Sequence, residues 1–395
     1  MKSNNLFNAL LVSIIVILAN PRIGVFFNNE EFKSNIIAFI LCVALLILRA
    51  HTYSKYVNSR ILSLLLLIIG CLAIGHTFGR DVIHAFFYEP LLPFESLAFI
   101  LITILAGYEI SNYPRAIIYA AIITLALAVY GNFAIESRNF FMSIGRESGA
   151  FEDPNIEMVH LMPLVLLALA FIDKPIYHLA LIIPAIFLAI YTVSRTSLFG
   201  GAFCLLLFIF FKWNDIRYHK YFKHPVYLFV TSIAIVIVGY EILNSDYLNL
   251  IILRIQERYE YSGIFGDRLD VISGLSQLDL TDFLSPIGIG FGYLGQSTKY
   301  SHNTFLDVLL IGGSIAFTLY LVVYANICYY AYKINPMLVL GIAFQIISLL
   351  TVSVIGWKIH WLILGIYSGI IENKVSIMRS RLIILNGDLE KEVKC

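Results

Sequence analysis

Three arginines and one histidine, from four separate parts of the chain, lie near the ends of predicted apolar helices. Arg146 shortly precedes Pro154, Arg195 lies in a short turn, Arg268 begins a predicted loop helix, and His302 directly precedes an apolar run. Arginine offers a planar fork of donors that matches phosphate oxygens in pairs. A histidine at a helix N-terminus favours its neutral form and can accept a proton. Cations that hold a diphosphate leaving group, beside a neutral base for an acceptor hydroxyl, would form a metal-independent glycosyl-transfer site.

The histidine belongs to a glycine-rich stretch that leads straight into an apolar helix. Ser301 is a good N-cap, which would place His302 and Asn303 in the first turn, where backbone N–H groups have no internal partner. This predicts a polar, anion-binding position at a membrane surface. We interpret the preceding glycines as a flexible connection into the helix rather than as a phosphate cradle: Gly288, Gly290, Gly292 and Gly295.

Each of these residues also has a simpler explanation. An arginine at a membrane surface most often contacts lipid headgroups or sets topology, and a lone loop histidine is inert about as often as not. Arg195 is the strongest of the three arginines, because it would lie on the outward side, against the usual bias of positive charge. Asp153 and Pro154 are a plausible N-cap and first helical residue, which places Asn155 beside the loop that carries Arg146.

The composition indicates a membrane protein with many spans. Of 395 residues, 59% are hydrophobic and 13% are charged, and the mean hydropathy is +0.83. The first apolar run starts near Leu6 without a following cleavage site, which favours a retained helix over a signal peptide. The five cysteines form no C-x-x-C motif and no outward pair, so neither a disulfide framework nor a zinc site is expected. No cofactor is expected, and the net charge of +1 gives no reason to expect a nucleic-acid partner.

Twelve apolar runs have about the length that crosses a bilayer. The predicted all-α fold is therefore a bundle of about twelve transmembrane helices. Their approximate limits are 6–19, 35–50, 60–76, 94–112, 115–133, 156–172, 176–193, 196–212, 224–243, 303–326, 337–355 and 359–372.

The distribution of Lys and Arg sets the orientation of the predicted bundle. Alternate loops carry most of the 27 cations, which predicts that both termini are cytoplasmic. These cations are Lys2, Arg49, Lys55, Arg60, Arg115, Lys174, Lys212, Arg217, Lys220, Lys223, Lys333, Lys374, Arg379, Arg381, Lys391 and Lys394.

The predicted organisation has nine spans in residues 1–243, a large periplasmic loop in 244–301, three spans in 302–372 and a cytoplasmic tail in 373–395. A second outward loop covers about residues 131–155. Within the large loop, one amphipathic helix is expected around residues 248–255, and another from Asp267 to about Asp279.

Few ionisable groups lie within the apolar runs. His160, His178 and Asp307 are the deepest that the sequence indicates. A proton- or ion-coupled pump normally carries carboxylates near the middle of the membrane. The polar features here gather at the outward ends instead, which favours a site that opens on the periplasmic side.

At these residues the chain resembles the bacterial O-antigen polymerase and O-antigen ligase superfamily. Pro286-Ile-Gly288-Ile-Gly290-Phe-Gly292 and His302-Asn303-Thr-Phe-Leu306 resemble its P-x-G-x-G-x-G and H-N-x-x-L signatures. Residues 146–155 resemble its R-x-x-G-x-F-x-x-P-N segment, and Ser194-Arg195-Thr196 its S-R-(S/T) turn. Arg268 lies where the family carries an arginine ahead of the glycines. The resemblance covers roughly residues 146–313.

The resemblance implies a membrane-embedded glycosyltransferase similar to the GT-C type, in the inner membrane, with a periplasmic active site. It would use an undecaprenyl-diphosphate-linked oligosaccharide as donor, without metal. By resemblance His302 would activate the acceptor hydroxyl, and Arg195 and Arg268 would hold the diphosphate. Arg146, with Asn155 and Asn303 nearby, would bind phosphate or sugar. Membrane lipids and a chain-length regulator protein are the other partners it suggests.

Three functions remain open. A polymerase and a ligase share this pattern and differ in the acceptor, which is another lipid-linked repeat or the lipid A core. The abundance of Ile, Asn, Phe and Tyr favours the polymerase. A lipid-linked oligosaccharide flippase could have the same number of spans, but it would be expected to have shorter outer loops and a charged central cavity.

Overall fold

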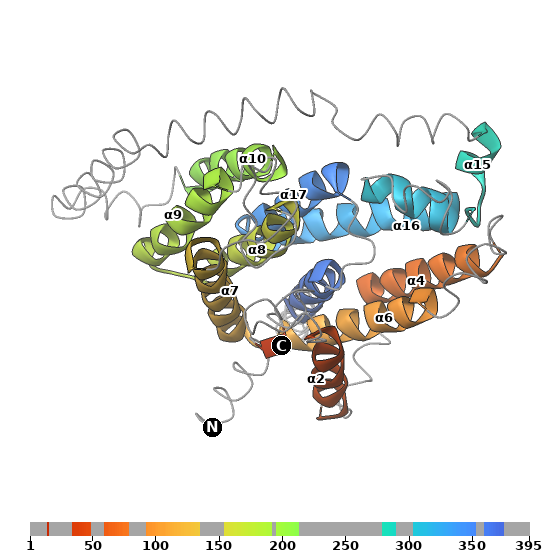
Figure 1. Ribbon diagram of the computed structural model, residues 1–395, viewed down its shortest axis with the longest axis horizontal. Helices are drawn as coiled ribbons and strands as arrows, with labels where there is room; N and C mark the ends of the chain where they lie inside the picture. Colours follow the sequence, from red (N-terminus) through yellow and green to blue (C-terminus); the bar gives the residue numbers. More distant parts are fainter. Residues whose placement is uncertain are drawn as a thin grey trace, which may run out of the picture.

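The computed structural model describes residues 14–15, 34–48, 59–78, 92–134, 154–191, 195–212, 279–289, 303–352 and 359–374. All regular structure in these ranges is helical, which confirms the all-α prediction for this part of the chain (Figure 1). The helices are α2 (Ser34–Leu48), α4 (Arg60–Phe78), α6 (Leu92–Ile110), α7 (Pro114–Ala134), α8 (Pro154–Leu169), α9 (Pro175–Tyr191), α10 (Arg195–Lys212), α15 (Leu280–Leu284), α16 (Thr304–Ile334), α17 (Leu338–Thr351) and the helix 359–374.

Ten of the twelve predicted apolar runs coincide with these helices, mostly to within a few residues at each end. The other two, 6–19 and 224–243, lie outside the described residues except for residues 14–15, which are helical. Most of the predicted loop 244–301 also lies outside them. In its described part, Asp279 was predicted to end a helix, but it is the N-cap of α15. Its N–H donates to the Asp282 side chain at 3.0 Å, which starts a helix there.

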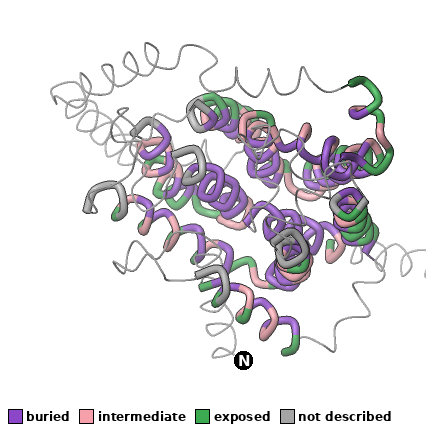
Figure 2. The backbone as a smooth tube through the Cα atoms, turned by 45° about the vertical axis from the view of Figure 1, so that its right-hand side comes forward, coloured by how far each residue is buried: buried purple, intermediate pink, exposed green. Residues whose placement is uncertain are grey.

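One described helix, α16, is long and apolar enough to cross a membrane. Helices α6 and α7 together would make a second, but they are bent by 117° relative to each other. Several helices have exposed residues along their outward faces (Figure 2). Many of these residues are large and apolar. On α10 these recur at helical spacing and form one exposed stripe: Phe199, Phe203, Leu206 and Phe210, the first 74% exposed and the last 72%. An apolar face of this kind suits a lipid or protein partner.

The 31-residue helix α16 reverses direction at Gly313. In a continuous helix, residues 305 and 324 would be about 28 Å apart along the axis. The rings of Phe305 and Tyr324 are instead 6.2 Å apart, and those of Phe305 and Tyr320 5.7 Å. Gly313 has φ 81° and ψ 177°, a conformation that essentially only glycine adopts. The prediction of one continuous span over 303–326 is therefore wrong: a short arm, residues 304–312, folds back on a long arm, residues 314–334.

The reversal leaves backbone groups without helical partners, and the segment 285–289 supplies them. The Ile289 N–H donates to Leu310 O at 2.7 Å, and the Ser314 N–H donates to Ser285 O at 2.9 Å. The Ser285 hydroxyl donates to Gly288 O at 3.2 Å and closes the turn between them. Gly288, with φ 78°, is buried against Ile311 O. The interpretation of this part of the glycine run as a flexible connector is wrong, because Gly288 packs against the backbone of α16.

Helix α4 approaches the same place through Gly75. A Cβ atom on Gly75 would overlap Ile311 O and would lie 2.5 Å from Ile287 O. Gly288, Gly313 and Gly75 thus bring three backbone segments closer together than side chains would allow. We call this contact the glycine crossing. Figure 1 shows α4 and α16 side by side, with α15 beside their ends.

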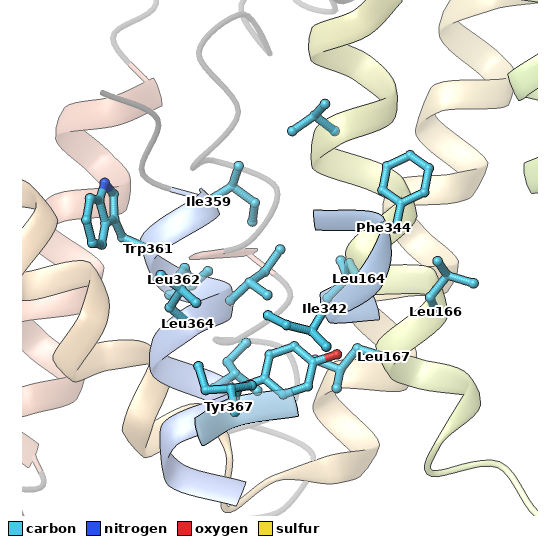
Figure 3. Close-up of a cluster of buried hydrophobic side chains, with 14 of the residues drawn as sticks. Leu164, Leu166, Leu167, Ile342, Phe344, Ile359, Trp361, Leu362, Leu364 and Tyr367 are labelled. Carbon is cyan, nitrogen blue, oxygen red and sulfur yellow. The ribbon is translucent and has the colours of Figure 1, made fainter. Parts of the chain in front are cut away.

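Side-chain contacts fix the directions of α8, α10 and α17. Cys204 donates to Leu340 O, whereas Thr196 bonds to Thr351, so α10 and α17 are antiparallel. Asn335, just before α17, donates to Ala170 O, just after α8, so these two helices are also antiparallel. The starts of α8 and α10 therefore share one end of the bundle with the last residues of α17. Figure 3 shows α17 between α8 and the helix 359–374.

The helix 359–374 runs parallel to α6. Gly365 and Gly107 approach so closely that a Cβ on Gly365 would be 3.1 Å from the Gly107 Cα. At its end, the Glu372 carboxylate accepts the backbone N–H of Arg60 at 3.1 Å. The Asn373 side-chain amide donates to the Asn112 side-chain oxygen at 3.0 Å. The Tyr367 hydroxyl donates to Leu338 O at 2.8 Å, which places this end beside the start of α17. One end of the bundle, which we call the basic end, thus carries the predicted cytoplasmic cations that are described there: Arg60, Arg115, Lys174, Lys212, Lys333 and Lys374.

The glycine crossing can be tested with two glycines of α4. Gly75→Ala is expected to lower the free energy of unfolding by about 3 kcal/mol or more, because its methyl group would overlap two backbone carbonyls. Gly70→Ala is the matched control, since no atom lies within 4 Å of its added Cβ. It is expected to be neutral or to stabilise the helix by up to about 1 kcal/mol. Thermal unfolding in detergent measures both, and equal effects would contradict the crossing.

Candidate active site

The last two described residues of the α17 segment bind the starts of two other helices. The Thr351 hydroxyl lies 2.6 Å from the hydroxyl of Thr196, the second residue of α10. The hydroxyl of Thr304, the first residue of α16, donates to Val352 O at 2.8 Å. Thr351 and Val352 are consecutive, so the first turns of α10 and α16 are held against the same point. We call this contact the junction.

The junction brings together two of the residues singled out in the sequence. Arg195 is the first residue of α10 and directly precedes Thr196. Asn303 directly precedes Thr304 and is the N-cap of α16, with its side-chain oxygen accepting the Leu306 N–H at 3.1 Å. The backbones of Arg195 and Asn303 therefore both lie at the junction, although they are more than 100 residues apart in the chain.

The predicted first turn of α16 was wrong by two residues. Ser301 was expected to cap the helix, which would have placed Asn303 inside it. Asn303 has φ −145° and ψ 110°, an extended conformation, and its carbonyl accepts the first helical bond from Asp307 N–H at 2.9 Å. Asparagine caps helices as well as serine does, so either residue fits the pattern and only the backbone geometry distinguishes them. Asn303 thus uses its side-chain oxygen within its own helix.

The start of α8 reaches about the same level of the bundle. The helix begins at Pro154, as the sequence predicts, and Asn155 is its second residue. A Cβ on Gly341 of α17 would lie 2.9 Å from Pro163 O, so these residues are level with each other. Pro154 is then about 14 Å along α8 from this contact, and Thr351 is about 15 Å along α17 in the same direction. Three helix N-termini therefore meet near one level.

The junction lies inward of the glycine crossing. The short arm carries nine residues from Thr304 to Gly312, which measures about 13 Å. The sequence predicted that Asn303 would lie at the outer surface of the bundle. The reversal at Gly313 places Asn303 inward of the glycine crossing, because the short arm starts at the level of Tyr320 and runs back toward the crossing.

The arrangement is suited to an anion. N–H groups in the first turn and the helix dipole give each N-terminus a partial positive charge, and those of α10 and α16 lie together at the junction. The Asp307 carboxylate, one turn into the short arm, is fully buried. Among the residues that the structure describes, no three His, Cys, Asp or Glu side chains lie close enough to hold a metal ion.

Sequence reasoning missed a buried polar cluster beside the junction. His360 Nε2 lies 2.9 Å from the Tyr320 hydroxyl, and His360 Nδ1 lies 2.8 Å from Gln345 Nε2. All three side chains are at most 2% exposed. Two signals were available: Gln345 is an amide in the middle of an apolar run, and His360 begins the next one. Neither signal identifies the partner, because Tyr320 is one of 24 tyrosines.

The other predicted site residues are placed only in part. Arg146, Arg268 and His302 lie outside the described residues, and Arg195 and Asn155 are described by their backbones. His302 directly precedes the described residue Asn303 in the chain. The sequence matches no protein-family model and no curated protein.

The capping role of Asn303 predicts a difference between two substitutions. Asn303→Ala should lower the free energy of unfolding by about 1 kcal/mol, because the Leu306 N–H loses its acceptor. Asn303→Asp should leave it nearly unchanged, since a carboxylate caps equally well and favours a helix N-terminus. Chemical unfolding in detergent measures both. An equal loss in the two variants would contradict the capping role.

Proposed function

We propose that this protein is an O-antigen polymerase of the bacterial inner membrane. It joins undecaprenyl-diphosphate-linked repeat units into long chains on the periplasmic face. The observation that supports this best is the junction: α10 and α16 begin against consecutive residues of one chain segment. That contact brings the backbone of Arg195 close to Asn303, the residue that follows His302 in the chain. Arg195 and His302 are two of the groups that the proposed chemistry needs.

The proposed reaction uses the donor diphosphate as leaving group. The acceptor hydroxyl oxygen attacks the anomeric carbon of the donor sugar, and the bond from that carbon to the diphosphate oxygen breaks. His302 accepts the hydroxyl proton, and undecaprenyl diphosphate leaves with the bonding electron pair. Arg195 and Arg268 stabilise the charge that develops on the diphosphate, and the converging helix N-termini add to this. Arg146, Asn155 and Asn303 contact phosphate or sugar at the same end.

The proposed membrane arrangement has about twelve spans, with both termini in the cytoplasm. Two features support it. The described cations of the predicted cytoplasmic loops gather at the basic end, and the junction lies toward the other end. Apolar side chains such as Phe199 and Phe210 are exposed on the outward faces of the helices, where lipid would cover them.

A deletion strain tests the proposed function through its lipopolysaccharide. Loss of the polymerase should leave a single repeat on the core, and His302→Ala should give the same pattern while the protein still reaches the membrane. Loss of a ligase or a flippase would leave a bare core instead. Long chains of normal length from the His302→Ala protein would show that His302 is not the catalytic base.

Two arginines at opposite ends of the bundle give a matched test of diphosphate binding. Arg195 begins α10 at the junction end, and Arg115 lies in the first turn of α7 at the basic end, where it is exposed. Arg195→Ala should slow chain extension by about 10- to 100-fold, the expected effect of losing a hydrogen bond to a charged group. Arg115→Ala should change the rate less than twofold. In vitro chain extension with purified donor measures both rates. Similar small effects of the two substitutions on the rate would show that Arg195 does not bind the diphosphate.

A further inference from the structure

The short arm of α16 rests on two buried tyrosines of the long arm. The Phe305 ring packs against Tyr320 and Tyr324, with ring centroids 5.7 Å and 6.2 Å away. Phe305 is the second residue of the arm, directly after Thr304, whose hydroxyl makes the junction. The position of the Tyr320 ring therefore sets where the arm begins, and with it the backbone of Asn303.

Only one of the two tyrosine hydroxyls bonds to His360. The Tyr320 hydroxyl is bonded to His360, whereas the buried Tyr324 hydroxyl has no hydrogen-bond partner in the described part of the chain. Gln345 Nε2 donates to His360 Nδ1 at 2.8 Å and to His360 O at 3.2 Å. With the Gln345 amide in this orientation Nδ1 accepts, so the imidazole proton is assigned to Nε2 and His360 donates to the Tyr320 oxygen. The orientation of the Gln345 amide thus sets the donor and the acceptor in both hydrogen bonds of His360.

His360 is itself held by contacts far from the junction. Its helix, 359–374, packs on α6 where Gly365 meets Gly107. The far end of that helix binds the start of α4 through Glu372. The ring of Trp361 lies 5.1 Å from that of His360 and 6.2 Å from that of Tyr320, so the pair is enclosed by aromatic side chains. The imidazole is thus held by contacts that do not involve the junction, and Tyr320 bonds to it.

We propose that His360 and Gln345 are positioning residues for the candidate active site, acting through Tyr320 and Phe305. The hydrogen-bonded chain from Gln345 to His360 to Tyr320 fixes the ring on which the short arm rests. That ring keeps Thr304 within reach of Val352 and so holds the first turn of α16 beside that of α10. The effect on catalysis rests on the proposed function, but the effect on geometry does not.

Tyr320 and Tyr324 supply a matched pair of substitutions for the test. Both are buried on the same helix, and Tyr→Phe keeps the ring of each. Tyr320→Phe removes the bond to His360, whereas Tyr324→Phe removes a hydroxyl that does not bond to His360 and leaves that bond intact. We expect Tyr320→Phe to lower kcat for chain extension about tenfold with KM changed less than twofold, the effect of one lost hydrogen bond on positioning. Tyr324→Phe should leave both values unchanged.

A cross-link reads the geometry independently of activity. Thr304→Cys with Val352→Cys, treated with a short bis-methanethiosulfonate, should give a linked peptide that mass spectrometry measures. Tyr320→Phe should reduce its yield severalfold, and Tyr324→Phe should not. The pair Thr196→Cys with Thr351→Cys is the control, because α10 and α17 pack without help from Tyr320. A lower yield for the pair at residues 304 and 352, with an unchanged yield for the control pair, would support the positioning role. If the wild-type protein extended no chains, that result would overturn the proposed function but not the positioning role.

A double variant separates positioning from misfolding. Tyr320→Phe leaves a buried His360 N–H without a partner, and this alone could unfold the protein. Tyr320→Phe with His360→Phe replaces both partners with apolar rings, a change that is often nearly neutral for folding. The double variant should fold and still show the low cross-link yield and the low kcat. Full recovery of both would overturn the proposal, as would equal behaviour of Tyr320→Phe and Tyr324→Phe.

Discussion

The turn at Gly313 is the feature on which the rest of the described structure depends. An apolar helix cannot stop inside a bundle unless its freed N–H and C=O groups find partners, because each unpaired group costs several kcal/mol in apolar surroundings. Here the segment 285–289 provides those partners through Ile289 and Ser285. Glycines at 75, 288 and 313 let the three backbones approach closely enough to bond. The reversal and the docked segment therefore require each other.

Two features follow from this reversal. The short arm of α16 starts partway into the bundle and runs back to the crossing, so its first residue meets the end of α17. That end of α17 also holds the start of α10, a contact that does not need the reversal, and the two contacts together make the junction. The start of the arm rests on Tyr320, which a hydrogen-bonded chain ties to His360 and Gln345. If α16 were one straight helix, Phe305 would lie about 22 Å along its axis from Tyr320. Neither the junction nor the aromatic support would then exist.

The bundle combines an apolar exterior with a small polar interior. Exposed phenylalanines on α10 contrast with buried Thr304, Asp307, Gln345 and His360. Most of the interior is also apolar, and it is the exposed apolar stripe on α10 that is uncommon in a water-soluble protein. Hydrogen bonds stabilise buried polar groups in apolar surroundings, and a bonded network favours one arrangement of its helices. In the described part of the chain, several polar contacts between helices lie where helix ends meet.

The sequence by itself was sufficient for the features that depend on neighbouring residues. Apolar runs of bilayer length predicted ten helices that the structure describes, and Pro154 marked the start of α8, because helix formation and capping act over a few residues. The alternation of basic loops anticipated which helix ends lie together at the basic end. The residue types near predicted helix ends also singled out Arg195 and Asn303, but the sequence could not show that their backbones both lie at the junction.

Only the tertiary structure decided the features that depend on distant segments. The reversal at Gly313 needs the backbone groups of 285–289, and a pattern of apolar residues is the same in a straight helix and a folded one. The choice of Asn303 over Ser301 as N-cap rests on backbone conformation, since both residues cap well. The bond between Tyr320 and His360 joins residues 40 positions apart. Such contacts arise from packing in three dimensions, which residue types and spacing along the chain do not specify.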